Sequence, residues 1–318
     1  MMDKLKMKHF KMSDYGVLIG FIVLCVAVGI AAPTFFSARN ILNLLRQSSI
    51  IGIIAVGMTS VIISGNFDIS VGAVAAITGA VVMKLLGNAV PLPVVILAGL
   101  ALGLAIGVCN GVVVAKFAVP SLIATMGMTT ILNGAVLMVT GGYPISGKYD
   151  LFDYIGNGYI LKIPIPVIIF ALAVAGMFFI LRCTKFGRYI FSVGGNEESS
   201  RLSGIKPDRI KIMVFAVSGM LSALAGIVLS SRLGTATPVA GSGYDMDAIA
   251  SVVIGGTSVL GGEGSVLKTV IGVLFMSVIN NAFNLLGVDV YFQYIVKGLI
   301  IIVAVGADSY SRKKAMLA

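Results

Sequence analysis

Long apolar runs recur along the whole chain and constrain its fold more than any other feature. About ten segments have the roughly 17 to 22 residues that a helix needs to cross about 30 Å of hydrocarbon. Only 11% of the residues are charged, against about a quarter in soluble proteins. We therefore predict an all-α integral membrane protein with about ten transmembrane helices. These are expected at 15–32, 41–63, 70–86, 93–115, 120–140, 163–182, 211–230, 246–261, 266–286 and 291–307.

The basic residues predict which side of the membrane each loop faces. Lysine and arginine collect before the first run, between the sixth and seventh runs, and at the C-terminus. Because basic loops stay in the cytoplasm, we expect cytoplasmic tails at 1–14 and 308–318 and a cytoplasmic loop at 183–210. The net charge of +10 follows from this topology and does not indicate nucleic-acid binding. The basic N-terminus also resembles a signal peptide, but no secreted domain follows it.

The chain lacks the residues that most active sites and metal centres require. His9 is the only histidine, which excludes catalytic triads, histidine metal sites and histidine proton relays. The stretch 142–148 resembles a phosphate-binding loop, but Tyr149 occupies the position of the serine or threonine that binds magnesium. The three cysteines are too far apart for a zinc or redox motif. We therefore predict no catalytic residue, metal or cofactor, and expect any ATP hydrolysis on a separate polypeptide.

A compact polar segment interrupts the apolar sequence near its middle. Asn196 is a good N-cap, Glu197 and Glu198 follow in the first turn, and Gly204 can end a helix in the left-handed conformation. Pro207 cannot continue that helix. The pattern predicts a helix of about two turns, roughly 10 Å long. It needs a surface to dock on, because such a short helix is marginal alone in water. A solvated linker is the alternative.

Three long stretches resemble one family of membrane proteins. They are VGMTSVIISGNFDISVGAVAAITGAV at 56–81, GRYIFSVGGNEESSRLSGI at 187–205 and GYDMDAIASVVIGGTSVLGGEGSV at 243–266. They resemble, in the same order along the chain, segments of ribose-type sugar permeases, the membrane subunits of bacterial ABC importers. Ser199 and Ser200 depart from that pattern, since relatives often have alanines there.

The resemblance implies a function and a set of partners. It implies a permease subunit of the bacterial inner membrane that moves a monosaccharide, works with a second permease copy, and needs a cytosolic ABC ATPase and an extracytoplasmic sugar-binding protein. The alternatives are a non-sugar solute such as a nucleoside or a furanose-derived signal, or an ion-coupled secondary transporter. The resemblance further implies that the polar helix couples the permease to the ATPase through Gly195, Asn196, Glu197, Glu198, Arg201, Leu202 and Gly204.

The two halves of the chain show a weak internal similarity. Aligning Asp68 with Asp245 places several identical residues opposite one another, and GMTS at 57–60 resembles GMLS at 219–222. The paired runs are the second and the seventh, so the copies would cross the membrane in opposite directions. This predicts an inverted repeat over 41–140 and 211–307, with the transport route between the halves. Chance similarity between helices rich in glycine and alanine is the alternative.

Several polar side chains fall within the predicted helices. A polar stripe on an apolar helix must face protein or water, because lipid would leave its hydrogen bonds unmade. Such stripes either line the route or pack against other helices. Asp68 could cap the next helix or act in the route, and Lys297 could reach outward or pair with Asp245, Asp247 or Asp289. Candidate route residues are Asp68, Ser70, Thr129, Asn133, Asn280, Asn281 and Asn284, with Thr125 and Ser277 on the same stripes.

A row of small residues predicts close helix packing. Gly99, Gly103, Gly107 and Gly111 recur every four residues, which places them on one side of the fourth helix. A bare ridge of this kind lets another helix approach closely. We interpret the row as structural.

Overall fold

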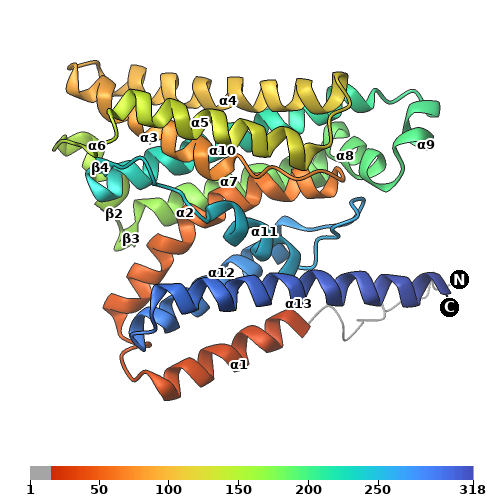
Figure 1. The fold of residues 1–318 in the computed structure, drawn as a ribbon. Helices are drawn as coiled ribbons and strands as arrows, with labels where there is room; N and C mark the ends of the chain where they lie inside the picture. The colour runs from red at the N-terminus through yellow and green to blue at the C-terminus, as the bar shows by residue number, and fades with distance from the viewer. Residues whose placement is uncertain (1–15, 318) are drawn as a thin grey trace, which may run out of the picture.

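A computed structural model describes residues 16–317 and consists mainly of helices (Figure 1). His9 and the predicted tail at 1–14 lie outside the described residues. The helices are α1 (Gly16–Ala31), α2 (Ala38–Ile63), α3 (Val71–Gly87), α4 (Leu92–Lys116), α5 (Ser121–Thr140), α6 (Asp150–Asn157), α7 (Ile165–Cys183), α8 (Lys185–Gly195), α9 (Glu197–Leu202), α10 (Pro207–Leu233), α11 (Tyr244–Ile254), α12 (Val266–Leu285) and α13 (Val290–Leu317).

Six of these helices are long and apolar enough to cross a membrane, namely α2, α4, α5, α7, α10 and α12. Three shorter apolar helices are Gly16–Ala31, Val71–Gly87 and Val290–Val303. The all-α membrane fold is thereby confirmed, whereas the number of about ten spans is not. The expected run over 246–261 is short and rich in glycine, which allows a break within it, and the structure has one, because α11 ends at Ile254. Gly256 has a φ of +82°, a conformation that ends a helix, and Gly261 and Gly262 also have positive φ.

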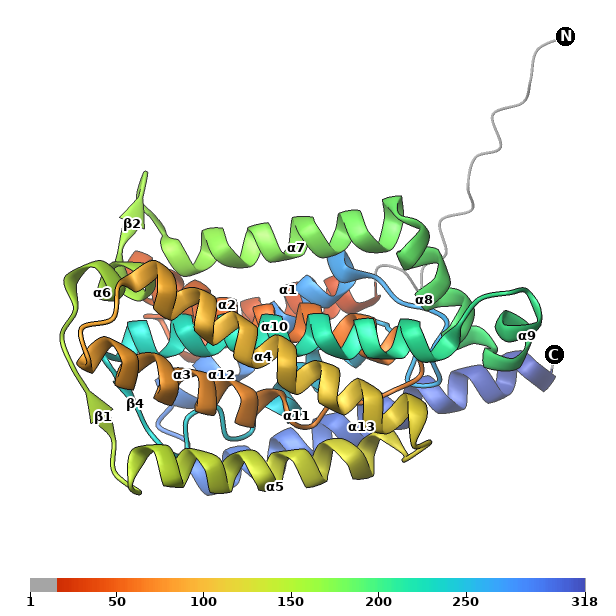
Figure 2. The same cartoon turned by 90° about the horizontal axis from the view of Figure 1, so that it is seen from above.

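The two ends of the molecule differ in the short helices and strands that they carry (Figures 1 and 2). One end, called the α6 end, carries α6 and four short strands. There β1 (Ile145–Ser146) pairs antiparallel with β4 (Thr235–Ala236), and β2 (Tyr159–Ile160) pairs with β3 (Ile163–Pro164). The other, called the α9 end, carries α8, α9 and the end of α13. The β1–β4 pair joins the two halves of the sequence.

The core forms where α10 packs on α4 and α2. The glycine row on α4 is confirmed as a packing ridge, because a Cβ on Gly103 would overlap Gly219 of α10 and one on Gly107 would overlap Phe215. Around this contact, the middles of α2 and α10 are almost wholly buried, with Ile54, Val56 and Phe215 all 0% exposed. The Thr59 and Thr269 hydroxyls lie 2.9 Å apart and connect α2 to α12. Helices α2 and α10 therefore form the centre around which the others are arranged.

Candidate functional site

Helices α3 and α11 begin next to one another inside the molecule. Each follows a non-helical stretch, 64–70 before α3 and 237–243 before α11. Gly72 and Gly241 lie backbone to backbone at this point, so a Cβ on either residue would overlap the other. Gly241 also has a φ of +82°, which side chains other than glycine rarely adopt. Two helix N-termini therefore meet away from the ends of the molecule.

A cavity of about 200 Å³ lies beside this meeting point. We call it the α3–α11 cavity. Two of the predicted route residues, Thr129 and Asn133, line it from α5, and Asp245 lines it from α11. Thr125, on the same stripe, is instead buried and accepts a hydrogen bond from Ile69 N at 3.2 Å. The remaining lining residues are Ile69, Gly72, Ala73, Pro238, Ala240, Gly241, Ser242 and Gly243.

Asp68 and Ser70 lie in a buried hydrogen-bond network and do not line the α3–α11 cavity. Asp68 Oδ1 accepts from Ser70 N at 3.0 Å and from Ser70 Oγ at 2.6 Å. Asp68 Oδ2 accepts from Ser218 Oγ of α10 at 3.1 Å, and Asn110 of α4 donates to Ser70 Oγ at 2.8 Å. Ser70 occupies the N-cap position of α3, with Asp68 two residues before it. This network holds the start of α3 against α4 and α10.

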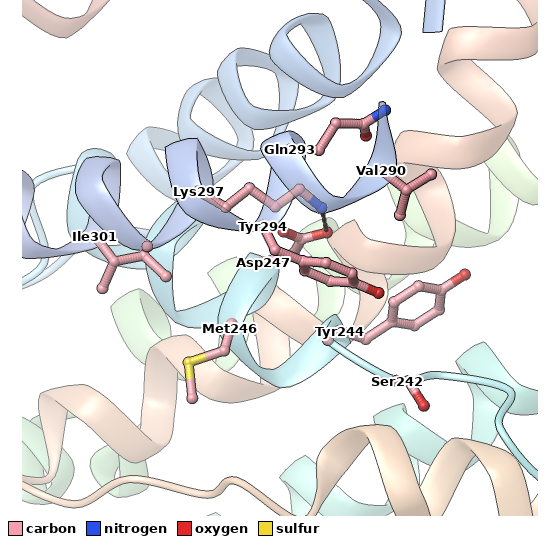
Figure 3. A pocket seen from close by; sticks show the side chains of 11 residues that line it. Ser242, Tyr244, Met246, Asp247, Val290, Gln293, Tyr294, Lys297 and Ile301 are labelled. Carbon is pink, nitrogen blue, oxygen red and sulfur yellow. Dashed lines mark hydrogen bonds and ion pairs between the residues drawn. The ribbon is translucent and has the colours of Figure 1, made fainter. Parts of the chain in front are cut away.

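Lys297 pairs with Asp247 in a second cavity, of about 430 Å³, between α11 and α13 (Figure 3). We call it the ion-pair cavity. The ammonium lies 3.1 Å from Asp247 Oδ2, and Asn280 donates to the same oxygen at 3.4 Å. The sequence left three partners open for Lys297, and the structure selects one. The rings of Tyr244 and Tyr294 lie close to the pair (Figure 3).

A third cavity, of about 220 Å³, adjoins the second and is lined by residues of five helices. We call it the amide cavity. Ser277, Asn280 and Asn284 of the predicted α12 stripe all line it. Asn281 does not, since it exchanges two hydrogen bonds of 2.9 Å with Asn40 of α2. The other lining residues are Gln47, Ile51, Arg232, Tyr244, Asp247, Gln293 and Lys297.

Tyr244, Gln293 and Arg232 were missed by the sequence reasoning, although they line these cavities. A usable signal existed for Gln293. It precedes Lys297 by four residues on the same helix, so the two polar groups share one face of an otherwise apolar segment. Tyr244 is the first residue of α11, a helix that begins inside the molecule. Arg232 lies in the last turn of α10, where basic residues are ordinary.

The polar segment at the α9 end forms the capped helix that the sequence predicts. Asn196 is the N-cap of α9 and accepts from Ser199 N at 2.8 Å. Gly204 follows the C-cap with a φ of +81°. Glu197 binds Lys211 of α10 at 2.7 Å and Arg201 at 3.4 Å. The helix is short, with six residues, and the Glu197–Lys211 ion pair connects it to α10.

Ser200 and Leu202 point in different directions from α9. The Ser200 hydroxyl lies 2.8 Å from that of Ser192 in α8 and is buried, so the serine that departs from the alanine pattern packs α9 on α8. Leu202 is 83% exposed. In the preceding helix, α8, a Cβ on Gly194 would overlap Ile63 O at the end of α2. The segment is thus closely connected to the core and presents one apolar side chain outward.

Comparison with known proteins identifies the family. A family described as branched-chain amino acid transport system / permease component matches residues 40–305. A ribose import permease protein of Haemophilus influenzae is 48% identical over 302 residues, covering 94% of each chain. The ribose import permease protein of Bacillus subtilis is 43% identical and covers 96% of each. A xylose transport system permease protein of Haemophilus influenzae is 37% identical, covering 97% of this chain and 99% of its own.

No solved structure matches this chain significantly. The sequence matches, however, span nearly the full length of both aligned chains at well above 30% identity. They include the three stretches in which the resemblance to ribose-type permeases was found. The chain therefore belongs to the permease-component family of transport systems, and within it to the ribose-type ABC permeases.

Proposed function

We propose that this chain is the translocation subunit of an ABC importer for a monosaccharide. The main support is that ribose and xylose permeases match this chain over more than nine-tenths of its length. The cavities fit a neutral solute. Their charged side chains comprise two of each sign, so the walls carry no net charge: Asp245, Asp247, Arg232 and Lys297. Amides and hydroxyls make up much of the remaining polar lining, and these can form exchangeable hydrogen bonds with a sugar.

The α9 end is proposed to face the cytosol and to bind the ABC ATPase. The basic residues of 183–210 favour this orientation, with both termini on the same side in the bacterial inner membrane. The exposed Leu202 and the capped helix offer a compact contact for a partner. The α6 end would then meet the extracytoplasmic sugar-binding protein. ATP hydrolysis is proposed on the partner subunit.

A second permease copy is proposed to cover α5. Asn133 is exposed on this helix, together with apolar neighbours such as Leu137. An amide that faced hydrocarbon would lose its hydrogen bonds at a cost of several kcal/mol. A partner helix, or a wet path between two copies, removes that cost. The α3–α11 cavity, which Asn133 lines, would then open toward the interface.

The route is proposed to run along α5 and α12, past the starts of α3 and α11. Thr129, Asn133, Asn280 and Asn284 line its cavities. Asp68 and Ser70 act by holding α3 in place, and Asn281 by packing α12 on α2. The inverted repeat over 41–140 and 211–307 is supported by the side-by-side starts of α3 and α11, although aligning Asp68 with Asp245 leaves these two starts four residues out of register.

Reconstitution of transport tests this function. We expect proteoliposomes that contain this chain, its ATPase and its binding protein to accumulate D-ribose or D-xylose only when ATP is present. The chain alone should not accumulate either sugar under a proton or sodium gradient. Gradient-driven uptake without ATP would show a secondary transporter instead. Uptake of a nucleoside in place of both sugars would show the non-sugar alternative.

Cysteine labelling tests the orientation. In a variant without the three native cysteines, single cysteines at positions 148 and 162 should react with an impermeant thiol reagent on intact cells. Cysteines at 188 and 209 should react only after the membrane is opened. The reason is that Lys148 and Lys162 lie at the α6 end, whereas Arg188 and Arg209 lie near the α9 end. Labelling at 188 but not at 148 on intact cells would contradict the orientation.

A further inference from the structure

The amide cavity contains two polar atoms that make no hydrogen bond within the described residues. They are Ser277 Oγ and Asn280 Oδ1, and both residues line this cavity. Ser277 is only 6% exposed. A buried polar group without a partner costs about 1–3 kcal/mol, so a ligand in the cavity that hydrogen-bonds these atoms would gain by removing that cost. They lie three residues apart on α12 and so share one helix face.

The charges around these atoms favour a neutral ligand. The Asp247 carboxylate, 6% exposed, already has a cationic partner in Lys297. Asn280 uses its amide nitrogen on the same carboxylate, which fixes the side chain and leaves its carbonyl oxygen as an acceptor. An ionic ligand would have to compete with this pair at a carboxylate that is almost wholly buried, where breaking an ion pair is costly. A neutral ligand leaves the pair intact.

The surrounding groups match the chemistry of a sugar. Gln47, Asn284 and Gln293 offer amide donors and acceptors, and Tyr244 offers a hydroxyl. Every sugar hydroxyl can donate one hydrogen bond and accept others, so it can satisfy an orphan carbonyl and an orphan hydroxyl at once. The ring of Tyr294 in the adjoining ion-pair cavity adds an apolar surface for C–H groups (Figure 3).

We propose that the amide cavity is a holding site for one neutral monosaccharide during its passage. A sugar hydroxyl donates to Asn280 Oδ1, and another exchanges a hydrogen bond with Ser277 Oγ. The proposal rests on the proposed function. It assigns the sugar a binding site on its route and names the two residues that recognise it there. The ion pair between Asp247 and Lys297 forms one wall of this site and keeps the amide of Asn280 oriented.

Protection of a reporter cysteine tests the site on the full chain alone, without ATP or partner subunits. Asn284→Cys, in a chain without native cysteines, places a thiol at the exposed rim of the cavity. We expect D-ribose or D-xylose to slow its reaction with a small neutral thiol reagent about tenfold at roughly ten times the Kd. A chain that keeps only Cys183, which is exposed at the α9 end, should react at an unchanged rate.

Two further variants identify the contacts. Ser277→Ala and Asn280→Leu should each raise the sugar concentration needed for protection, by about fivefold for the loss of one hydrogen bond. Ser222→Ala is the matched control, because that buried hydroxyl bonds Ser218 O within α10 and lines none of the three cavities. Ribose 5-phosphate should protect less well than ribose.

Three results would overturn the holding site. The first is no protection by either sugar, which would mean that water alone satisfies the two atoms. The second is protection that neither variant weakens. The third is stronger protection by ribose 5-phosphate than by ribose. Any of these can occur while ATP-driven uptake is normal, in which case the proposed function stands. Protection of the reporter cysteine by sugar, without ATP-driven uptake, would contradict the proposed function and still support the holding site.

Discussion

Gly107→Leu is expected to prevent this chain from folding in the membrane. A Cβ at position 107 already overlaps Phe215 O and lies 2.9 Å from Ala216 Cα, and these are backbone atoms that cannot move aside as a side chain could. The leucine must therefore push α4 away from α10, and the core between them loses its close packing. Overpacking a core costs about 1–3 kcal/mol or more. Because α4 and α10 form the central contact, we expect the loss of folding free energy to lie at or above the upper end of this range.

The measurement is the amount of folded chain recovered from membranes, by size-exclusion profile and by thermal unfolding in detergent. Gly176→Leu is the matched control, because it makes the same change within a long membrane helix, α7, and its Cβ would have nothing within 4 Å. We expect the control to be recovered at the normal level. Equal recovery and equal unfolding temperature for the two variants would contradict the packing role of the α4 ridge.

Leu202→Asp is expected to uncouple the permease from its ATPase without disturbing its fold. Leu202 is 83% exposed on α9, so it contributes little to the core, and an aspartate in its place would oppose burial of this position against a partner. An anchor in the centre of an interface contributes about 2 kcal/mol or more. We therefore expect the Kd of the permease–ATPase complex to rise by roughly thirtyfold or more, and sugar uptake to fall with it.

Association of the purified permease with its ATPase, measured alongside uptake, checks this expectation. Leu161→Asp is the control, since Leu161 is 91% exposed and lies at the α6 end, away from α9. It should bind the ATPase with unchanged affinity. Normal association and normal uptake by Leu202→Asp would show that α9 is a linker and not a coupling element.

Local patterns in the sequence predicted the local structure well. The cap of Asn196 and the turn at Gly204 follow from preferences that act within a few residues, and the structure has both. The glycine ridge of α4 was likewise visible from its spacing alone. The break after Ile254 was not placed, because a window of apolar residues does not report that Gly256 takes a positive φ.

Contacts between distant segments could not be predicted from the sequence. The α12 stripe is one periodic pattern, yet Asn280 faces a cavity while its neighbour Asn281 meets Asn40. Periodicity gives the face of a helix and not the helix that covers it. For the same reason the partner of Lys297 stayed open among three aspartates until the packing of α11 against α13 was known.

The contact behind α9 is made by main-chain atoms, and this has a consequence for how such importers diversify. Gly262 N donates to Ile63 O at 2.8 Å, and the backbone of Gly194 lies against the same carbonyl. Glycines make up this junction, since a Cβ on Gly261 would meet Gly194 O and Gly65 Cα, and one on Gly262 would meet Gly195 Cα. The outward side chains of Glu198, Arg201 and Leu202 are free of it. If α9 has the proposed coupling role, a new ATPase partner can be selected by substitutions on that outer face while the glycine junction is inherited unchanged.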